Sequence, residues 1–263
     1  MPRFKLTLEY AGTRYSGWQK QTNARTVQGE LERAIVAGLG DVLVDSQGSG
    51  RTDAGVHALA QVAHVDLVRA PALEQLRRRI NDELPADVNV LDAAAVSRKF
   101  HARHSAVRRS YVYQVSRRRS AFAKPYVWWV KDPIDLGRMQ AVAAGFVGRH
   151  DFQAFSDDDP DEKSTLVELD EVTLTEAGPL LLVRVAGSHF LWKMVRRMVG
   201  VLVAAGTGAL PPARIAAWLA DPRAPGRGEP ARLTAPSAGL FLERVFYEGD
   251  RWPEPLRPPV GVR

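Results

Sequence analysis

The chain has no cysteine among its 263 residues, and it has only six histidines. The lack of cysteine excludes disulfides and thiolate zinc sites. His57 and His64 have no carboxylate at a recognisable ligand spacing, so we predict no metal ion. No stretch approaches the roughly 18 apolar residues of a membrane helix, and the N-terminus lacks the apolar run of a signal peptide. We therefore expect a cytoplasmic protein with no membrane contact.

Positive charge is in excess: 36 lysines and arginines stand against 30 aspartates and glutamates, which gives a net charge of +6. A surface of this sign attracts polyanions, and nucleic acid is the simplest such partner. Any single basic cluster is equally typical of a solvated face, so only the joint excess indicates RNA. The clusters are Arg77 to Arg79, Arg108 with Arg109, Arg117 to Arg119, and Lys193 with Arg196 and Arg197.

Hydrophobic residues make up 45% of the chain, which is enough for a packed core. Apolar residues that alternate with polar ones predict strands, and apolar residues at four-residue spacing predict helices. The predicted strands are 4–10, 62–68, 89–96, 110–116 and 240–247, with a hairpin over 171–185 that turns at 177–179. The predicted helices are 27–39, 73–84, 136–146 and 190–203, and Thr26 is the predicted N-cap of the first. In the last helix, Lys193, Arg196 and Arg197 lie opposite the apolar face.

The order of these elements predicts two similar halves. We expect an N-terminal domain over 1–100 and a C-terminal domain over 101–250, with a polar crossover at 98–105. Residues 221–237 are rich in proline, glycine and alanine and predict a loop. The proline-rich tail 251–263 is expected to be poorly ordered.

The segment GSGRTDAGVH, residues 48 to 57, places Asp53 between an arginine and glycines. Arg51 favours the ionised form of a neighbouring carboxyl group, and an ionised carboxylate can act as a nucleophile. Gly48, Gly50 and Gly55 permit positive φ and a close approach of substrate to the main chain. An Asx turn or helix cap explains Thr-Asp-Ala-Gly equally well. A phosphate-binding loop is excluded, because Asp45 stands where its first glycine belongs.

Together with its surroundings, this segment resembles the tRNA pseudouridine synthases of the TruA family. The resemblance spans nearly the whole chain, and GRTDAGVH is its most specific part. The matching pieces are LEYAGTRYSGWQKQ (8 to 21), TVQGELERAI (26 to 35), GRTDAGVHALAQVAHVD (50 to 66), NDELPADV (81 to 88), FHARHSAVRRSYVY (100 to 113), HDFQAFS (150 to 156), SHFLWKMVRRMVG (188 to 200) and AGLFLERVFY (238 to 247).

The resemblance implies an α+β pseudouridine synthase fold. Two similar α/β domains would form a continuous mixed, mainly antiparallel sheet, with helices packed on it and an RNA-binding cleft. It also implies a homodimer that binds the anticodon arm of tRNA and modifies uridines 38, 39 and 40. No nucleotide or other cofactor is implied, because the isomerisation needs no redox step and no group donor.

The resemblance also implies roles for single residues. Asp53 matches the catalytic aspartate, which acts either at carbon 6 of the uracil or at the anomeric carbon of the ribose. Tyr111 matches the active-site tyrosine that would stack on the flipped uracil, although Tyr113 shares its strand face. Arg196 matches the arginine that pairs with the aspartate, and Arg51 matches a basic residue that aids base extrusion.

Further residues are expected to bind RNA, because aromatic and basic side chains together stack bases and hold phosphates. A role in the protein core is the alternative for the aromatic residues, and a solvated face is the alternative for the basic ones. These candidates are Phe100, His101, Arg103, Phe155, Lys193 and Arg197.

Two other functions remain open at this point. A noncatalytic RNA-binding or chaperone protein could keep the same fold, but it would not need a carboxylate beside an anionic backbone, where the charge costs affinity. A hydrolase could use Asp53 as a general base, and it would release uracil and leave an abasic site.

Overall fold

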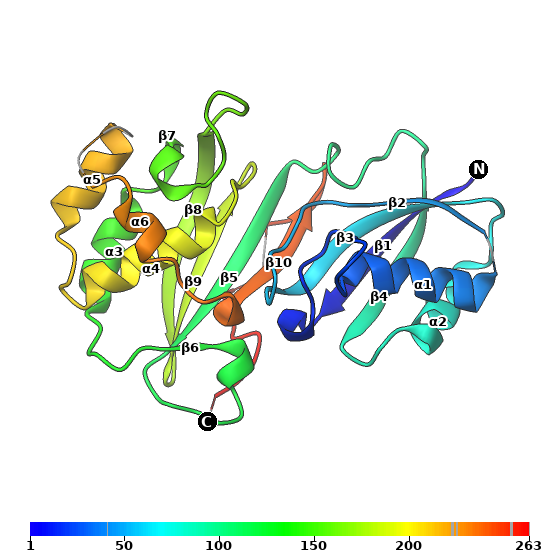
Figure 1. The fold of residues 1–263 in the computed structure, drawn as a ribbon, viewed down its shortest axis with the longest axis horizontal. Helices are drawn as coiled ribbons and strands as arrows, with labels where there is room; N and C mark the ends of the chain where they lie inside the picture. The colour runs from blue at the N-terminus through cyan, green and yellow to red at the C-terminus, as the bar shows by residue number, and fades with distance from the viewer. Residues whose placement is uncertain (41, 222–223, 225, 253–254, 263) are drawn as a thin grey trace. The chain divides into compact units, whose positions relative to one another are not determined.

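The computed structural model describes residues 1–40, 42–221, 224, 226–252 and 255–262. They form two compact units. Unit 1 comprises Met1–Val107 and Phe241–Trp252, and unit 2 comprises Arg108–Leu240 and Pro253–Arg263. Each unit combines a sheet with helices (Figure 1).

The sheet of unit 1 is built around the first strand. β1 (Arg3–Tyr10) lies between β3 (His57–Leu67) and β4 (Val88–Val96) and is antiparallel to both. β2 (Leu43–Gly48) pairs antiparallel with β3, and the start of β10 (Leu240–Phe246) pairs parallel with it. The predicted alternation is confirmed in β1, whose side chains at every second position are buried.

Two helices complete unit 1. α1 (Val27–Leu39) packs against α2 (Leu73–Glu83) and β2, and α2 packs against β4 (Figure 1). The predicted cap of α1 is confirmed, because the Thr26 hydroxyl accepts a hydrogen bond from the Gly29 N–H. Such a cap stabilises a helix by about 1 kcal/mol. The helix ends before Gly40, whose φ of 82° favours glycine.

The sheet of unit 2 contains the predicted hairpin. β8 (Leu166–Ala177) and β9 (Leu180–Gly187) are joined at Gly178, which has a φ of 59°. β5 (Arg108–Ser116) is antiparallel to β9, and β7 (Gly148–Asp151) is antiparallel to β8. β6 (Trp128–Trp129) pairs parallel with the end of β5. Both units therefore contain mixed, mainly antiparallel pairing.

Unit 2 has four α-helices among its described residues. They are α3 (Leu136–Ala144), α4 (Met194–Gly206), α5 (Pro212–Ala220) and α6 (Glu229–Arg232). α5 and α6 were not expected from the sequence, and α6 lies within the predicted loop 221–237, of which residues 222, 223 and 225 lie outside the described part. Short 3₁₀ helices are η1 (Gly12–Arg14), η2 (Lys124–Tyr126), η3 (Gln153–Phe155) and η4 (Ser237–Gly239).

The C-terminal segments are divided between the two units. Residues 241–252, which include most of β10, belong to unit 1, where Phe241 and Leu242 pair with β3. The tail was expected to be poorly ordered, but Leu256 and Val262 pack against a buried cluster of unit 2 that contains Leu182. The Val260 N–H also donates to Gln114 Oε1 at 3.3 Å. Residues 253, 254 and 263 of the predicted tail lie outside the described residues.

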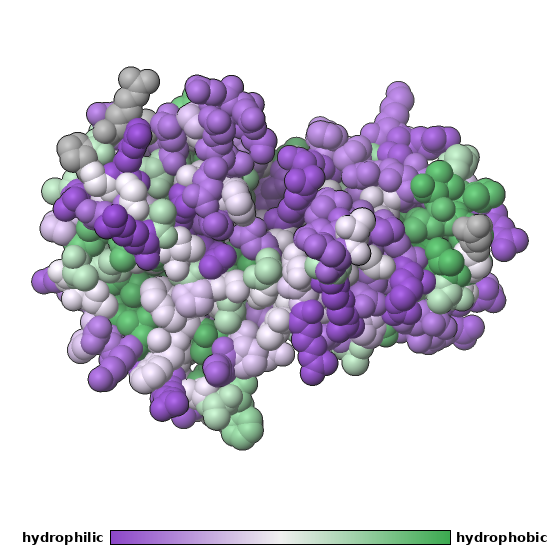
Figure 2. Space-filling model, in the orientation of Figure 1, coloured by the Kyte–Doolittle hydropathy of each residue, from purple (hydrophilic) through white to green (hydrophobic). Residues whose placement is uncertain are grey.

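The predicted α+β class is confirmed by these two units. Most of the face shown in Figure 2 is hydrophilic, and hydrophobic side chains gather beside the end of α1. Among the described residues, no helix is both long enough and apolar enough to cross a membrane.

Candidate active site

The loop that carries Asp53 is tied to β3 where it begins. The Ser49 N–H donates to the Val62 carbonyl at 2.8 Å, and the Ser49 hydroxyl donates to Gln61 Oε1 at 2.6 Å. Gln61 Nε2 in turn donates to the Gly50 carbonyl at 3.1 Å. Gln61 is fully buried, so this side chain fixes the start of the loop from inside unit 1.

The other end of the loop is tied to the segment before α1. The Trp18 N–H donates to the Thr52 carbonyl at 3.0 Å, and the Gly55 N–H donates to the Tyr15 carbonyl at 3.2 Å. The Val56 N–H closes a turn onto the Asp53 carbonyl at 3.1 Å. Asp53 itself is only partly buried. The loop therefore holds the carboxylate on a fixed backbone.

The three glycines of the motif have different roles. Gly55 has a φ of 77°, as predicted. Gly48 is required for close packing, because a Cβ there would lie 2.4 Å from Trp18 Nε1. Gly50 lies in open space, and neither Gly48 nor Gly50 has a positive φ.

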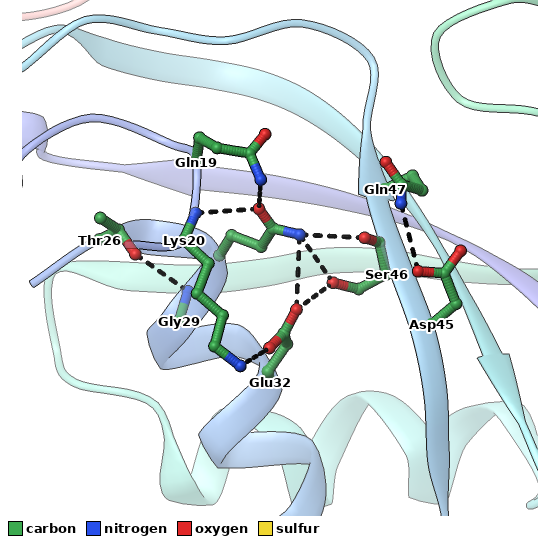
Figure 3. Close-up of polar contacts among 9 residues, drawn as sticks. Gln19, Lys20, Thr26, Gly29, Glu32, Asp45, Ser46 and Gln47 are labelled. Carbon is green, nitrogen blue, oxygen red and sulfur yellow. Dashed lines mark hydrogen bonds and ion pairs between the residues drawn. The ribbon is translucent and has the colours of Figure 1, made fainter. Parts of the chain in front are cut away.

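Arg51 is exposed, and its Nε donates to Gln19 Oε1 at 3.2 Å. Gln19 belongs to the WQKQ segment that precedes α1. A polar network continues from Gln19 to α1 and β2 (Figure 3).

His57 orders the backbone beside the loop. Its Nδ1 accepts a hydrogen bond from the Gly12 N–H at 3.0 Å, and its ring stacks on Phe241 at 4.7 Å. His64 is likewise buried, and its Nδ1 accepts from the Ala102 N–H at 3.1 Å. Among the described residues, no group of three His, Cys, Asp or Glu side chains is arranged to hold a metal ion.

The two tyrosines of β5 have different surroundings in unit 2. Tyr113 is fully buried, and its hydroxyl donates to the Pro236 carbonyl at 2.7 Å. Burial raises the pKa of Tyr113 above its ordinary value. Tyr111 is only partly buried, and its ring meets Phe190 edge-on at 5.0 Å. Tyr111 therefore keeps accessible surface, whereas Tyr113 belongs to the core.

Arg196 lies in the first turn of α4 and is anchored to the chain before β10. Its Nε donates to the Ala235 carbonyl at 2.7 Å, and its own carbonyl accepts from the Ala235 N–H at 3.0 Å. Gly200 allows this approach, because a Cβ there would lie 1.7 Å from the Leu233 carbonyl oxygen. The backbone of unit 2 thus fixes the start of the Arg196 side chain.

The other basic residues of this helix do not all face solvent, which corrects the prediction. Arg197 is only 4% exposed and pairs with Asp157. Lys193 also pairs with Asp157, at 2.8 Å between Nζ and Oδ2. Lys193 and Arg197 hold the pKa of the Asp157 carboxyl below its usual range. The guanidinium of Arg197 therefore forms an ion pair inside unit 2, and its burial does not support a contact with RNA.

α4 also begins later than the predicted 190–203. Lys193 has a φ of 61°, which a helix interior does not allow, so the helix starts at Met194. Asp158 Oδ2 accepts from the Trp192 N–H at 2.8 Å just before this start.

Phe155 was expected to stack on RNA, but its side chain has 0% exposure. Its ring meets Phe146 edge-on at 5.4 Å and Trp218 at 6.4 Å. All three rings lie within unit 2, and Phe155 is therefore a core residue.

The expected RNA-binding residues of the 98–105 crossover lie in unit 1. The ring of Phe100 contacts that of Tyr247 at 5.0 Å, and it is partly buried. His101 Nδ1 accepts from the Arg103 N–H at 3.1 Å, and Arg103 is exposed. A contact between these three residues and RNA remains a prediction.

The candidate residues are divided between the units. Asp53 and Arg51 belong to unit 1, whereas Tyr111, Arg196 and Lys193 belong to unit 2. Local sequence pattern did not indicate Gln19 as a partner of Arg51 or Asp157 as a partner of Lys193. Gln28 was also missed, although a glutamine beside the apolar positions Val27 and Leu31 of a helix is a sign of a buried polar contact.

Comparisons with known proteins agree with the resemblance. A family model described as tRNA pseudouridine synthase matches residues 7–105 and 142–248. A relative from Nitrobacter winogradskyi, named tRNA pseudouridine synthase A, is 43% identical over 256 residues, covering 95% of this chain and 97% of the relative. A relative of the same name from Agrobacterium fabrum is 40% identical, covering 100% of this chain and 98% of the relative. Another, from Methylobacterium nodulans, is 44% identical, covering 94% of this chain and 96% of the relative. With most of its length matched by the family model, this chain belongs to the tRNA pseudouridine synthase family.

Proposed function

We propose that this protein isomerises uridine to pseudouridine at positions 38, 39 and 40 of the tRNA anticodon stem-loop, without a cofactor. The observation that carries the proposal is the Asp53 loop: its backbone is held by hydrogen bonds on both sides of a partly exposed Asp53, in a member of this family. Relatives over nearly the whole length carry the name of this activity.

The chemistry needs one carboxylate and one proton acceptor. The Asp53 carboxylate attacks either carbon 6 of the uracil or the anomeric carbon of the ribose. The bond between the anomeric carbon and N1 breaks, the base rotates, and a bond forms from carbon 5 to the anomeric carbon. The bond between Asp53 and the substrate also breaks, which regenerates the free carboxylate. The hydrogen at carbon 5 leaves as a proton and N1 gains one, so the reaction is an isomerisation. Tyr111 stacks on the flipped uracil, and its hydroxyl takes part in this proton transfer.

Arg196 is the proposed partner of Asp53. A guanidinium favours the ionised carboxylate and orients its two oxygens through a fork of donors. The anchoring of Arg196 Nε on Ala235 supports this role, because it leaves the rest of the guanidinium on a restrained stem.

The proposed RNA contacts are basic or aromatic residues with accessible surface: Arg51, Phe100, His101, Arg103 and Lys193. They bind the anticodon arm by stacking and by contacts with phosphates. The protein acts as a homodimer in the cytoplasm, where its tRNA substrate is found. Sedimentation equilibrium tests the dimer, and a monomeric mass across the assay concentrations contradicts it.

Release of tritium from uracil carbon 5 tests the activity. The purified protein is incubated with unmodified tRNA labelled at that carbon, without added metal or nucleotide. Wild type should release tritium and leave pseudouridine at 38 to 40, whereas Asp53→Asn should bind tRNA without release. Tight binding by wild type without release would favour the noncatalytic RNA-binding protein, and free uracil would show the hydrolase.

A further inference from the structure

We infer that Gln28 is a positioning residue for Arg51, acting through Gln19. The inference rests on the proposed function, because it assigns Arg51 a part in handling the substrate base. Gln28 lies in the first turn of α1 and is only 5% exposed. Its side chain joins the loop before α1 to β2 through hydrogen bonds to Lys20 and Ser46.

Backbone groups of fixed polarity orient the Gln28 amide. Gln28 Nε2 donates to the Ser46 carbonyl at 2.9 Å, and a carbonyl can only accept. Gln28 Oε1 accepts from the Lys20 N–H at 3.0 Å, and a backbone N–H can only donate. A flipped amide would place its oxygen against the Ser46 carbonyl and its nitrogen against the Lys20 N–H, so neither hydrogen bond could form. The direction of this side chain is therefore determined by the main chain on both sides.

The orientation passes from Gln28 to Gln19. Gln28 Oε1 also accepts from Gln19 Nε2 at 2.9 Å, so the amide nitrogen of Gln19 faces Gln28. The remaining atom of the Gln19 amide, Oε1, then accepts from Arg51 Nε at 3.2 Å. Hydrogen bonds of fixed direction therefore link Ser46 on β2, through Gln28 and Gln19, to Arg51, which lies two residues before Asp53. We call this chain of hydrogen bonds the relay.

A charged group supports the buried end of the relay. Glu32 Oε1 accepts from the Ser46 hydroxyl at 2.6 Å, and Glu32 Oε2 pairs with Lys20 Nζ at 2.5 Å (Figure 3). The Ser46 hydroxyl in turn accepts from Gln28 Nε2 at 3.0 Å. Because both amide hydrogens of Gln28 bond to Ser46 on β2, its oxygen can only face the Gln19 amide nitrogen and accept from it. Gln28 therefore acts on Arg51 without reaching the substrate.

A double-mutant cycle tests this inference. Single-turnover tritium release is measured for Gln28→Met and Gln19→Met, each in the wild type and in Arg51→Lys, which keeps the charge but lacks Nε. We expect each methionine variant to lower the rate about fivefold beside Arg51 and to have almost no effect in Arg51→Lys. Equal losses in both backgrounds would show a general structural role and overturn the inference.

Gln47→Met is the matched control. Gln47 is exposed like Gln19, lies on β2, and donates to Asp45 Oδ1 at 3.2 Å (Figure 3). Its replacement should leave the rate unchanged. Gln19→Met alters an exposed side chain and leaves the buried network intact, so this arm keeps the test valid if Gln28→Met folds poorly.

The pH dependence of the rate in Gln28→Glu separates loss of the relay from general destabilisation of the fold. The introduced carboxylate would face the Ser46 carbonyl and the charge of Glu32, and both burial and that charge raise its pKa. Once protonated, it can donate to Ser46 and accept from Gln19. Relative to wild type, its rate should therefore recover as the pH falls from about 8 to about 6, whereas Gln28→Met should show no recovery.

The outcomes for the relay and for the activity are separate. Tritium release by wild type with unchanged rates in Gln28→Met and Gln19→Met would overturn the relay and leave the activity standing. A flat pH profile for Gln28→Glu would also count against the relay. No release by wild type would overturn the proposed activity and, with it, the relay.

Discussion

At the scale of single residues, β5 carries two tyrosines that differ in burial although they share a strand face. Tyr113 is held by the Pro236 carbonyl and packs against Gly239, where a Cβ would lie 2.5 Å from its ring. Tyr111 contacts Phe190 and keeps accessible surface. Alternation alone could not separate them, because it gives both the same face, whereas the resemblance names Tyr111. The accessible surface of Tyr111 supports that proposal.

Phenylalanine at each position should separate stability from activity. Tyr113→Phe removes the hydrogen bond from the buried Tyr113 side chain to the Pro236 carbonyl. It should lower the free energy of unfolding by about 1 kcal/mol and leave tritium release near wild type. Tyr111→Phe should lower the release rate at least tenfold with little change in melting temperature. Chemical denaturation and single-turnover assays measure the two effects, and the reverse pattern would refute the assignment.

His64 predicts a pH dependence of stability. Burial, followed by the nearby charges of Arg3 and His101, lowers its pKa to about 4. An unfolded histidine titrates near 6.5. Between these values the unfolded chain binds a proton that the folded chain does not bind, so stability falls as the pH drops from about 6.5 toward 4. The contribution is on the order of 2 to 3 kcal/mol.

His64→Asn isolates this contribution. Its amide oxygen can accept from the Ala102 N–H in place of Nδ1, and it does not titrate. Urea denaturation at about pH 7 and about pH 5 should show a smaller loss of stability in the variant than in wild type. Equal losses would mean that His64 does not contribute.

At the scale of elements, the start of α4 depends on a carboxylate from another segment. Asp157 neutralises Arg197, and Lys193 with φ of 61° ends the irregular chain before the helix. A left-handed residue that is not glycine costs about 1 to 2 kcal/mol. The ion pairs from Asp157 offset that cost at the turn that precedes Arg196.

Asp157→Asn should therefore destabilise the protein. It leaves the buried guanidinium of Arg197 without its counter-charge, and we expect a loss of about 2 kcal/mol, since Asp157 is itself 34% exposed and partly screened by water. Asp159→Asn is the control, because Asp159 accepts from the Asp161 N–H within its own loop. Equal melting temperatures for the two variants would contradict the role of Asp157.

Elements with a strong period were predictable, and those with a weak one were not. β1 alternates cleanly, and α1 combines four-residue spacing with a threonine cap, so local pattern sufficed. β2 has the sequence LVDSQG, which does not alternate, and it was missed. This strand is stabilised by its pairing with β3 and by the buried contacts of Ser46. α5 begins at Pro212 after a second proline, which favours a loop by composition.

The candidate site was predictable only in part, because motifs name residues but not their partners. Asp53, Arg51, Tyr111 and Arg196 came from the resemblance. The anchoring of Arg196 by Ala235 joins positions 39 residues apart, and that of Arg51 by Gln19 joins positions 32 residues apart. Such contacts depend on tertiary packing, which local pattern does not encode. The burial of Phe155 and Arg197 was missed for the same reason.

At the scale of the whole molecule, unit 1 needs a strand from the far end of the chain. Phe241 stacks on His57, and the Tyr247 hydroxyl donates to the Ala102 carbonyl at 2.8 Å. The Val107 N–H also donates to the Phe246 carbonyl at 2.9 Å. Two such buried aromatic side chains stabilise a fold by about 2 kcal/mol each, a large share of the roughly 5 to 15 kcal/mol available to a domain.

Truncation after Leu240 should therefore prevent unit 1 from folding stably. Amide hydrogen exchange should show lost protection in β1 and β3, which lie in unit 1. Truncation after Trp252 is the control, because it keeps all of unit 1 and removes only the tail contacts of unit 2. Full protection of β3 in the shorter chain would contradict this dependence.

The discontinuity of unit 1 also sets an order of events during translation. The first 107 residues leave the ribosome long before residues 241–252 exist. At ~5 to 20 residues per second, the nascent N-terminal part waits on the order of ten seconds or more for its last strand. During this interval the β3 edge that pairs with β10 has no partner from its own chain, and such edges are prone to pair with other chains. The incomplete unit is therefore open to such pairing until residues 241–252 emerge, and heterologous production should benefit from added chaperone.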